Sequence, residues 1–303
     1  MDWTLRFDEQ VASELPEVRI ECDEPMSRHT SFRVGGPARR MAFPKCSAEL
    51  EKLYQLADAA STLVIGRGSN LLVADEGLDR LVISTEQMNQ ISLGQDENTI
   101  VAEAGVPLAR LAEFAAKQGL TGLEFAHGIP GSVGGAVCMN AGAYDGVMRD
   151  VVQSVSVLFP EKGIQTLSCE EMNFGYRHSL LTEQPEAIAV STVFRLQKGD
   201  EETIREKMRE LMARRKSSQP LEYPSAGSFF KRPEGHFAGA LIQQCGLKGL
   251  TVGGAQISEK HAGFLLNIGG ATCADIMELC NQVQKRVYEE TGVHLEREVK
   301  LVK

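Results

Sequence analysis

The first third of the chain alternates helix-like apolar spacing with short apolar runs. A helix that Ser47 can cap is followed by a strand-like run at 62–65. Its inward positions are Leu50, Leu53 and Leu56. This alternation predicts an α/β arrangement.

Residues 99–105 form the next predicted strand, which leads into a helix opened by Pro107 at its first helical position. The apolar face of this helix holds Leu108, Leu111, Ala112 and Ala115. Further strands are predicted at 81–84, 151–158 and 188–196. The pattern therefore predicts a mixed layer of strands and helices up to about residue 196.

A charged helix is predicted at 199–216, with acids near its start and bases near its end. Its apolar positions are Ile204, Met208, Leu211 and Met212. The following segment, 217–224, reads as a linker and predicts a domain boundary near 214–220.

The remaining residues predict a small α/β domain. An apolar segment at 237–245 precedes strands near 251–257 and 263–268 and a helix from about Ala274. The inward positions of that helix are Ile276, Cys280, Val283 and Val287.

A final strand is predicted at 293–302. Because strand side chains alternate, its apolar residues share one face while Glu296 and Glu298 share the other. The apolar residues are Val293, Leu295, Val299 and Leu301.

Composition and charge exclude several classes of protein. The chain has 303 residues, 43% hydrophobic and 24% charged, and a formal net charge of -9. This balance is that of a globular protein and disfavours a general nucleic-acid or membrane-surface binder. The start of the chain lacks a signal-peptide pattern, so we expect a cytoplasmic protein.

The longest uncharged stretch, 125–144, is rich in glycine and contains Pro130, which is poor material for a membrane-spanning helix. Seven cysteines are scattered without a CxxC pair or a histidine at metal-ligand spacing. We therefore expect no membrane span, no metal, and reduced structural thiols.

A glycine loop, GRGSN at 66–70, follows the strand at 62–65. Its backbone can turn sharply and direct N–H groups at an anion such as a diphosphate. An ordinary glycine turn is the alternative. A Rossmann fingerprint would need glycine where Leu71 stands, and no GK[ST] follows any glycine loop.

A second glycine system spans 122–144 and is far denser. Missing side chains let a large flat ligand approach the backbone closely. The alternative is close packing of a helix on a strand, or a set of turns.

Together these two segments resemble the FAD-binding domain of the vanillyl-alcohol-oxidase type. Four more motifs narrow the resemblance to the UDP-N-acetylenolpyruvoylglucosamine reductase family, and the match covers nearly the whole chain. They are HTSFRVGGPA (29–38), FGYRHS (174–179), PSAGSFFKRP (224–233) and LEREVK (295–300).

The resemblance implies an α+β protein, with a vanillyl-alcohol-oxidase-type FAD-binding fold of two α/β subdomains and a C-terminal α/β substrate-binding domain. The subdomains would be 1–80 and 81–213, and the third domain 214–303. It also implies an enzyme that reduces UDP-N-acetylglucosamine enolpyruvate to UDP-N-acetylmuramate in peptidoglycan precursor synthesis, with FAD as cofactor and NADPH as reductant.

Some oxidases of the wider superfamily tether flavin through a histidine in the first glycine loop. Here that loop ends in Asn70, so the resemblance implies non-covalent FAD. The FAD-binding residues it implies are Gly66, Gly68, Ser69, Asn70 and Leu71 in the first segment, and Gly128, Ile129, Gly131, Gly134, Gly135 and Asn140 in the second.

The family reaction needs a fixed donor for the enolate charge that develops on the substrate carboxylate, and a proton delivered from a defined face. Arg177 suits the first demand because a guanidinium matches a carboxylate in a bidentate manner. The resemblance makes Arg177 catalytic and Tyr176 a substrate contact. Taken alone, an arginine beside a tyrosine is usually a surface ion-pair former.

The resemblance makes Ser228 the proton donor, in a segment of small residues followed by two phenylalanines. It makes Glu298 the third catalytic residue, which hydrogen-bonds the intermediate or tunes Ser228. Without the family resemblance, the sequence alone would favour Ser228 as a turn residue and Glu298 as a solvated acid.

The diphosphate of a nucleotide sugar also needs donors. Lys231 and Gln219 are the candidates, with Arg214, Arg215 and Lys216 nearby; solvated helix and loop ends are the alternative. His29 and His127 have no partner at metal spacing and read as core or loop residues.

One departure separates two branches of the family. Some members carry an extra loop whose tyrosine closes over the substrate, and no insertion is evident between Ser179 and Gly199. The chain resembles the shorter branch, which leaves open how its substrate site closes and whether Arg232 replaces an asparagine contact.

Two other functions are possible interpretations of the sequence. A flavin oxidase of the same superfamily would keep the glycine loops without needing Arg177, Ser228 and Glu298. A non-catalytic flavin- or nucleotide-sugar-binding protein is the second. The oligomeric state and the preference for NADPH over NADH are left open.

Overall fold

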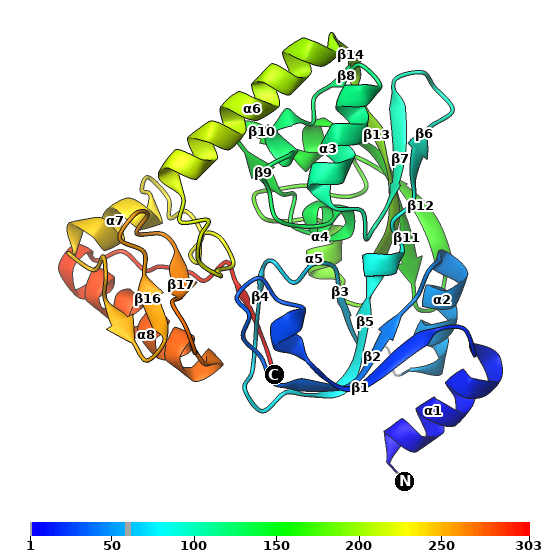
Figure 1. Cartoon of the computed structure of the whole chain (residues 1–303), viewed down its shortest axis with the longest axis horizontal. Helices are drawn as coiled ribbons and strands as arrows, with labels where there is room; N and C mark the ends of the chain where they lie inside the picture. The colour runs from blue at the N-terminus through cyan, green and yellow to red at the C-terminus, as the bar shows by residue number, and fades with distance from the viewer. Residues whose placement is uncertain (1, 58–61) are drawn as a thin grey trace. The chain divides into compact units, whose positions relative to one another are not determined.

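The computed structural model describes residues 2–57 and 62–303 (Figure 1). The chain forms two compact units. Unit 1 comprises the described residues of 1–22, 40–67 and 80–214. Unit 2 comprises 23–39, 68–79 and 215–303. The division into domains at 80 and 213 stays a prediction.

Unit 1 is built on a five-stranded antiparallel sheet in the order β12-β11-β13-β7-β6. The strands are β12 (Gly163–Ser168), β11 (Val152–Phe159), β13 (Ile188–Arg195), β7 (Thr99–Glu103) and β6 (Ile91–Leu93). Three of these confirm the strands that the sequence predicts from 99 to 196.

Helices α3 (Leu108–Lys117) and α4 (Val133–Cys138) complete the core of this sheet. The predicted inward residues of α3 are all buried, which follows from their helical spacing. Pro107 is the N-cap of α3, so its expected place at the first helical position is wrong by one residue.

A second core of unit 1 lies between α1 (Trp3–Glu14) and α2 (Ser47–Leu56) and includes Phe7, Leu50 and Leu53. Cys46 is the N-cap of α2 without a side-chain cap bond, so Ser47 does not cap this helix. A four-stranded sheet has the order β1-β2-β5-β3. Its strands are β1 (Arg19–Pro25), β2 (Pro37–Phe43), β5 (Leu78–Ser84) and β3 (Leu63–Ile65).

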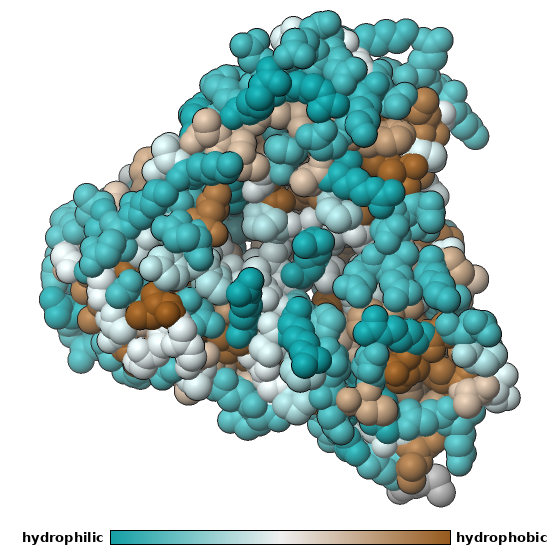
Figure 2. Space-filling view, viewed as in Figure 1, coloured by the Kyte–Doolittle hydropathy of each residue, from teal (hydrophilic) through white to brown (hydrophobic). Residues whose placement is uncertain are grey.

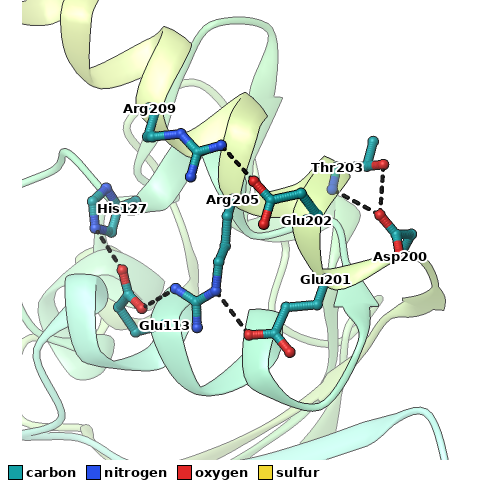
Figure 3. Close-up of polar contacts among 8 residues, drawn as sticks. All are labelled: Glu113, His127, Asp200, Glu201, Glu202, Thr203, Arg205 and Arg209. Atoms are coloured by element: carbon teal, nitrogen blue, oxygen red, sulfur yellow. Dashed lines mark hydrogen bonds and ion pairs between the residues drawn. The ribbon is translucent and has the colours of Figure 1, made fainter.

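Helix α6 runs from Glu201 to Ser218, two residues beyond its predicted end, so the expected linker begins inside the helix. Its first half is tied to α3 by ion pairs, drawn in Figure 3: the Arg205 guanidinium contacts Glu113 and Glu201, each at 2.8 Å. The other oxygen of Glu113 lies 3.3 Å from His127 Nε2. The second glycine segment is thereby connected to α3 and α6.

Unit 2 contains helices α7 (Ala238–Gln244) and α8 (Cys273–Thr291) beside a three-stranded sheet. Its strands are β15 (Thr251–Val252), β16 (Ala255–Ile257) and β17 (Leu265–Asn267). All four predicted inward residues of α8 are buried, which confirms that prediction.

Residues 71–73 also belong to unit 2, where β4 (Leu71–Val73) pairs in parallel with β18 (Lys300–Val302). Beyond β4, the Asp75 carboxylate accepts the N–H groups of Cys273 and Ala274 at 2.7 and 3.0 Å. It thereby satisfies donors at the start of α8.

The predicted C-terminal strand at 293–302 is regular only at β18, with one bridge between Phe230 and Arg297 before it. The apolar face was read correctly: Leu295 and Val299 are buried. Only three residues have a regular partner, because the neighbouring strand β4 is itself three residues long.

The smaller elements connect these layers. They are η1 (Met26–Arg28), η3 (Thr85–Gln87), β8 (Leu120–Thr121), η4 (Glu124–Ala126), β9 (Gly142–Ala143), β10 (Gly146–Val147), η5 (Met148–Asp150), α5 (Leu180–Glu183) and β14 (Gln197–Lys198).

Hydrophilic residues predominate on the face that Figure 2 shows. Of the helices in the described part of the chain, none combines the length and apolar character needed to cross a membrane.

Candidate active site

The first glycine loop connects β3 to β4, and the chain passes from unit 1 to unit 2 after Arg67. A Cβ at Gly66 would collide with Ser132 Oγ. Gly68 has a φ of +57°, and a Cβ there would collide with the backbone carbonyl of His29. Glycine is therefore required at both positions, by close approach at Gly66 and also by conformation at Gly68.

The second glycine segment runs from η4 into α4 in unit 1. A Cβ at Gly134 would lie 2.9 Å from the Cβ of Ala104, so close helix–strand packing accounts for this glycine. Gly135 is exposed, and its added Cβ would lie 4.0 Å from Ser132 Oγ, in ordinary contact. The packing alternative thus explains Gly134 but not Gly135.

The buried hydroxyl of Ser132 indicates where a ligand could bind. Its side chain is 1% exposed, and Oγ has no hydrogen-bond partner among the described residues. A buried hydroxyl without a partner is costly and marks a place where a polar ligand atom fits. Beside Gly66 and Gly135, this hydroxyl suits the polar part of a bound dinucleotide such as FAD.

Asn140, in the second segment just after α4, has a left-handed backbone with a φ of +41° and is 6% exposed. Its Oδ1 accepts the N–H of Arg149 at 2.9 Å, and its Nδ2 donates to the carbonyl of Gly175 at 2.9 Å. The side-chain amide therefore connects this segment to the FGYRHS motif. The FAD contact expected of Asn140 stays a prediction.

Tyr176 and Arg177 form the tip of a tight turn closed by backbone bonds between Gly175 and His178. Arg177 has a φ of +53°, a left-handed conformation that is unfavourable for a long side chain. Its guanidinium carbon lies 5.3 Å from the ring centroid of Tyr176, which is 59% exposed. The turn presents both side chains predicted to meet substrate.

Ser228 and Glu298 lie on adjacent extended segments of unit 2. The N–H of Glu298 donates to the carbonyl of Phe229 at 2.9 Å, and Phe230 bridges Arg297. On its other side Ser228 bridges Phe264. Both backbones are therefore fixed by bonds between residues far apart in the sequence.

The first glycine loop joins the same arrangement within unit 2. The carbonyl of Asn70 accepts the N–H of Lys300 at 3.0 Å, and Asn70 Nδ2 donates to the carbonyl of Glu298 at 3.2 Å. The last residue of the first glycine loop is thus bonded to the segment of a predicted catalytic acid.

The predicted diphosphate donors have different surroundings. Lys231 Nζ pairs with Glu296, whose carbonyl also accepts the Lys231 N–H at 2.8 Å. In unit 2, Gln219 Oε1 is buried without a hydrogen-bond partner in the part of the chain that the structure describes. In unit 1, Arg214 lies over the Tyr144 ring at 4.9 Å.

All seven cysteines, each of them described, are outside disulfides. Burial raises the pKa of the Cys273 thiol to about 11, and that of Cys280 to about 12. These thiols stay protonated and unreactive at neutral pH, as the sequence predicts for structural cysteines. Over residues 2–57 and 62–303, no group of three or more His, Cys, Asp or Glu residues is placed to hold a metal ion.

Sequence reasoning overlooked two serines. Ser132 lies inside the glycine-rich segment 122–144. Ser31, in the HTSFRVGGPA motif, donates its N–H to the Gly68 carbonyl at 3.3 Å, and its Oγ is buried without a partner among the residues described. The sequence signal for both is a serine within a glycine-containing motif.

Comparison with known proteins decides the family. Residues 38–168 match the family described as FAD binding domain, and residues 219–302 match UDP-N-acetylenolpyruvoylglucosamine reductase, C-terminal domain. The UDP-N-acetylenolpyruvoylglucosamine reductase of Pediococcus pentosaceus is 46% identical over 298 residues, covering 98% of each chain. The chain belongs to the UDP-N-acetylenolpyruvoylglucosamine reductase family.

Two further relatives carry the same name. The reductase of Latilactobacillus sakei is 48% identical and covers 94% of each chain. The crystal structure of the reductase from Thermus caldophilus matches with a TM-score of 0.79 and 37% identity, over 95% of this chain and 99% of that one. The family membership confirms the expected α+β, vanillyl-alcohol-oxidase-type fold and an FAD-dependent oxidoreductase.

Proposed function

We propose that this member of the reductase family reduces UDP-N-acetylglucosamine enolpyruvate to UDP-N-acetylmuramate, with Arg177, Ser228 and Glu298 as its catalytic residues. NADPH is the reductant and FAD the cofactor, and the product serves peptidoglycan synthesis. The full-length similarity to reductases of this name supports the reaction. The observation that carries the residue assignment is the backbone ladder that holds the Ser228 and Glu298 segments side by side.

The reaction adds one hydride and one proton across the enolpyruvyl double bond and leaves a lactyl ether. When bound, FAD carries the hydride from NADPH to the terminal alkene carbon. Arg177 binds the substrate carboxylate through paired donors and stabilises the negative charge that it gains as an enolate. Ser228 Oγ–H donates its proton to the carbon between the ether oxygen and the carboxylate.

A serine hydroxyl is a weak acid, so its use requires a strongly basic enolate and a source that returns the proton. We assign Glu298 to hydrogen bonding with the intermediate or to tuning of the Ser228 hydroxyl. The conjugate base of Ser228 regains its proton through neighbouring groups or water.

The cofactor is held without a covalent bond by the two glycine segments. Gly66 and Gly68 leave no room for a side chain, and Gly135 is exposed. Ser132 Oγ and Ser31 Oγ are hydroxyls that lack partners among the described residues. The other FAD contacts of the proposal are Ser69, Asn70, Leu71, Gly128, Ile129, Gly131, Gly134 and Asn140.

The substrate contacts we propose are Tyr176, Lys231 and Gln219. The exposed ring of Tyr176 and the partnerless Oε1 of Gln219 are the supporting observations. Glu296 already pairs with Lys231, so the substrate diphosphate must compete with a carboxylate for that ammonium group.

We also propose that the enzyme works in the cytoplasm and has no nucleic-acid partner. Seven cysteines that remain thiols are typical of a reducing compartment. A net charge of -9 repels a phosphate backbone.

The test of the residue assignment is Ser228→Ala, followed by anaerobic stopped-flow absorbance of the flavin. Flavin reduction by NADPH should stay within about twofold of wild type, while reoxidation by the enolpyruvyl sugar slows by about 10²- to 10⁴-fold, the usual contribution of a general acid. Wild-type reoxidation in this variant would remove Ser228 from the proton-donor role.

A further inference from the structure

Each of the two glycine segments contains an asparagine whose side-chain amide donates to a backbone carbonyl outside that segment. In unit 1, Asn140 Nδ2 donates to Gly175, the residue before Tyr176 and Arg177. In unit 2, Asn70 Nδ2 donates to the carbonyl of Glu298 itself. Both acceptors therefore lie in segments that carry a catalytic residue of the proposed function.

The surroundings of Asn140 fix its side chain in the orientation that donates to the Gly175 carbonyl. It is 6% exposed, and its amide is engaged at both ends, since Oδ1 accepts the Arg149 N–H while Nδ2 donates to Gly175. The asparagine amide offers an acceptor and a donor on two separate atoms, so it can bond both groups at once. Asparagine also tolerates the left-handed φ of +41° better than most residues do.

The segment that Asn140 anchors ends in a tight turn. The turn at Tyr176 and Arg177 is closed by two local backbone bonds of 3.0 and 3.4 Å between Gly175 and His178. Arg177 is itself in an unfavourable left-handed conformation. A bond to the carbonyl at the base of this turn fixes where the strained turn begins.

Asn70 makes the corresponding contact in unit 2. Its main-chain carbonyl accepts the Lys300 N–H at 3.0 Å, in line with the parallel pairing of β4 and β18. Its side chain extends this pairing by two residues, to the carbonyl of Glu298 at 3.2 Å. The chain just before β18, which already pairs through its backbone with Phe229 and Lys231, thereby gains a side-chain bond to the first glycine loop.

We infer that Asn70 and Asn140 are positioning residues, which transmit the placement of the flavin-binding segments to Glu298 and to the Arg177 turn. This inference rests on the proposed function of Glu298 and Arg177. It differs from a role as flavin contacts alone, because the bonds run to protein carbonyls rather than to the cofactor. Both residues act through another residue and not on the substrate.

The test uses Asn140→Asp and Asn70→Ala in the full-length, FAD-loaded enzyme. Aspartate keeps the acceptor for the Arg149 N–H and loses the donor to Gly175. Asn140→Gly is a second variant that keeps the left-handed backbone if the aspartate variant does not fold. The control is Asn98→Ala, which removes a bond of the same kind, from Asn98 Nδ2 to the Leu196 carbonyl at 3.0 Å.

Three quantities are measured: the FAD dissociation constant, the rate of flavin reduction by NADPH, and the rate of reoxidation by UDP-N-acetylglucosamine enolpyruvate. The FAD dissociation constant should rise in both variants, because both asparagines are also proposed FAD contacts. In the fully loaded enzyme, flavin reduction by NADPH should stay within about threefold of wild type. Reoxidation should slow by about 10- to 100-fold, as for a misplaced catalytic group, and remain normal in Asn98→Ala.

Combined variants decide whether the effect passes through the catalytic residue. Asn140→Asp added to Arg177→Ala, and Asn70→Ala added to Glu298→Gln, should slow reoxidation no further than the catalytic substitution alone. Full additivity in either pair would overturn the inference for that asparagine.

Two other results would also overturn it. A raised FAD dissociation constant with normal reoxidation of the loaded enzyme would make the asparagines flavin ligands only. Equal slowing of both half-reactions would make them structural. If Arg177→Ala and Glu298→Gln themselves reoxidise normally, the proposed function of those residues fails, whatever the asparagine variants do.

Discussion

The segment that carries Arg177 and the segments that carry Ser228 and Glu298 are held in different ways, although Asn140 also bonds the base of the Arg177 turn. The Arg177 turn is closed by bonds between near neighbours and is strained at Arg177, with a φ of +53°. Ser228 and Glu298 instead lie on extended chain held by bonds to residues far away in the sequence.

This difference suits the proposed roles. An arginine that binds a carboxylate carries its own long side chain and tolerates a locally built turn. A proton donor must sit at one place relative to a reacting carbon, because displacements of about 1 Å are costly. Non-local bonds through Phe229, Phe264 and Asn70 provide that placement.

The largest effect expected in the unit 1 turn is that of Arg177→Ala. Loss of both guanidinium donors should lower kcat/KM for the enolpyruvyl sugar by about 10³-fold, while flavin reduction by NADPH stays near wild type. Steady-state and half-reaction kinetics measure this. A loss confined to NADPH reduction would contradict the carboxylate-binding role.

Arg177→Lys tests bidentate binding of the substrate carboxylate with a smaller change. One ammonium group keeps the charge but cannot reproduce the paired donors, so we expect a loss of about 10²-fold in kcat/KM. Turnover at the wild-type rate in this variant would count against bidentate binding.

Ser132→Ala separates cofactor binding from folding. FAD affinity should fall by about tenfold, the scale of one lost hydrogen bond, while the apoprotein becomes more stable by about 1 kcal/mol because a partnerless buried hydroxyl is removed. Flavin fluorescence and thermal unfolding of the apoprotein measure the two effects. Ser179→Ala is the control: Ser179 Oγ donates to the Cys138 carbonyl at 2.7 Å, so its loss should destabilise.

The smallest effect is expected from Asp75→Asn in unit 2. It weakens the interaction of a carboxylate with the N–H groups of Cys273 and Ala274 at the start of α8. We expect a loss of about 1 kcal/mol of stability and a fall in Tm of about 2 °C. If Asp75→Asn instead slowed proton transfer to the substrate and left Tm unchanged, Asp75 would contribute to the reaction and not to stability.

The sequence predicted the elements that periodicity specifies well. The inward faces of α3 and α8 are buried as predicted, because helical spacing alone determines which residues face a core. The C-terminal strand is shorter than its alternation predicts, since pairing depends on a partner that the pattern does not reveal. The starts of α2 and α3 differ by one residue from the predictions at Ser47 and Pro107, because residue type alone does not determine where the first helical backbone bond forms.

The site shows the same limit. The glycine segments were recognisable from their density, whereas the partnerless hydroxyl of Ser132 became evident only when the packing around it was known. The bonds from Asn70 to Glu298 and from Asn140 to Gly175 join residues far apart in the sequence. No local pattern encodes such contacts.

The most direct test of the central claim is an anaerobic visible-absorbance trace of the FAD-loaded protein during sequential additions. NADPH should bleach the flavin, and UDP-N-acetylglucosamine enolpyruvate should then restore its colour with formation of UDP-N-acetylmuramate. Flavin that bleaches but regains colour only when oxygen is admitted would contradict the account and favour an oxidase.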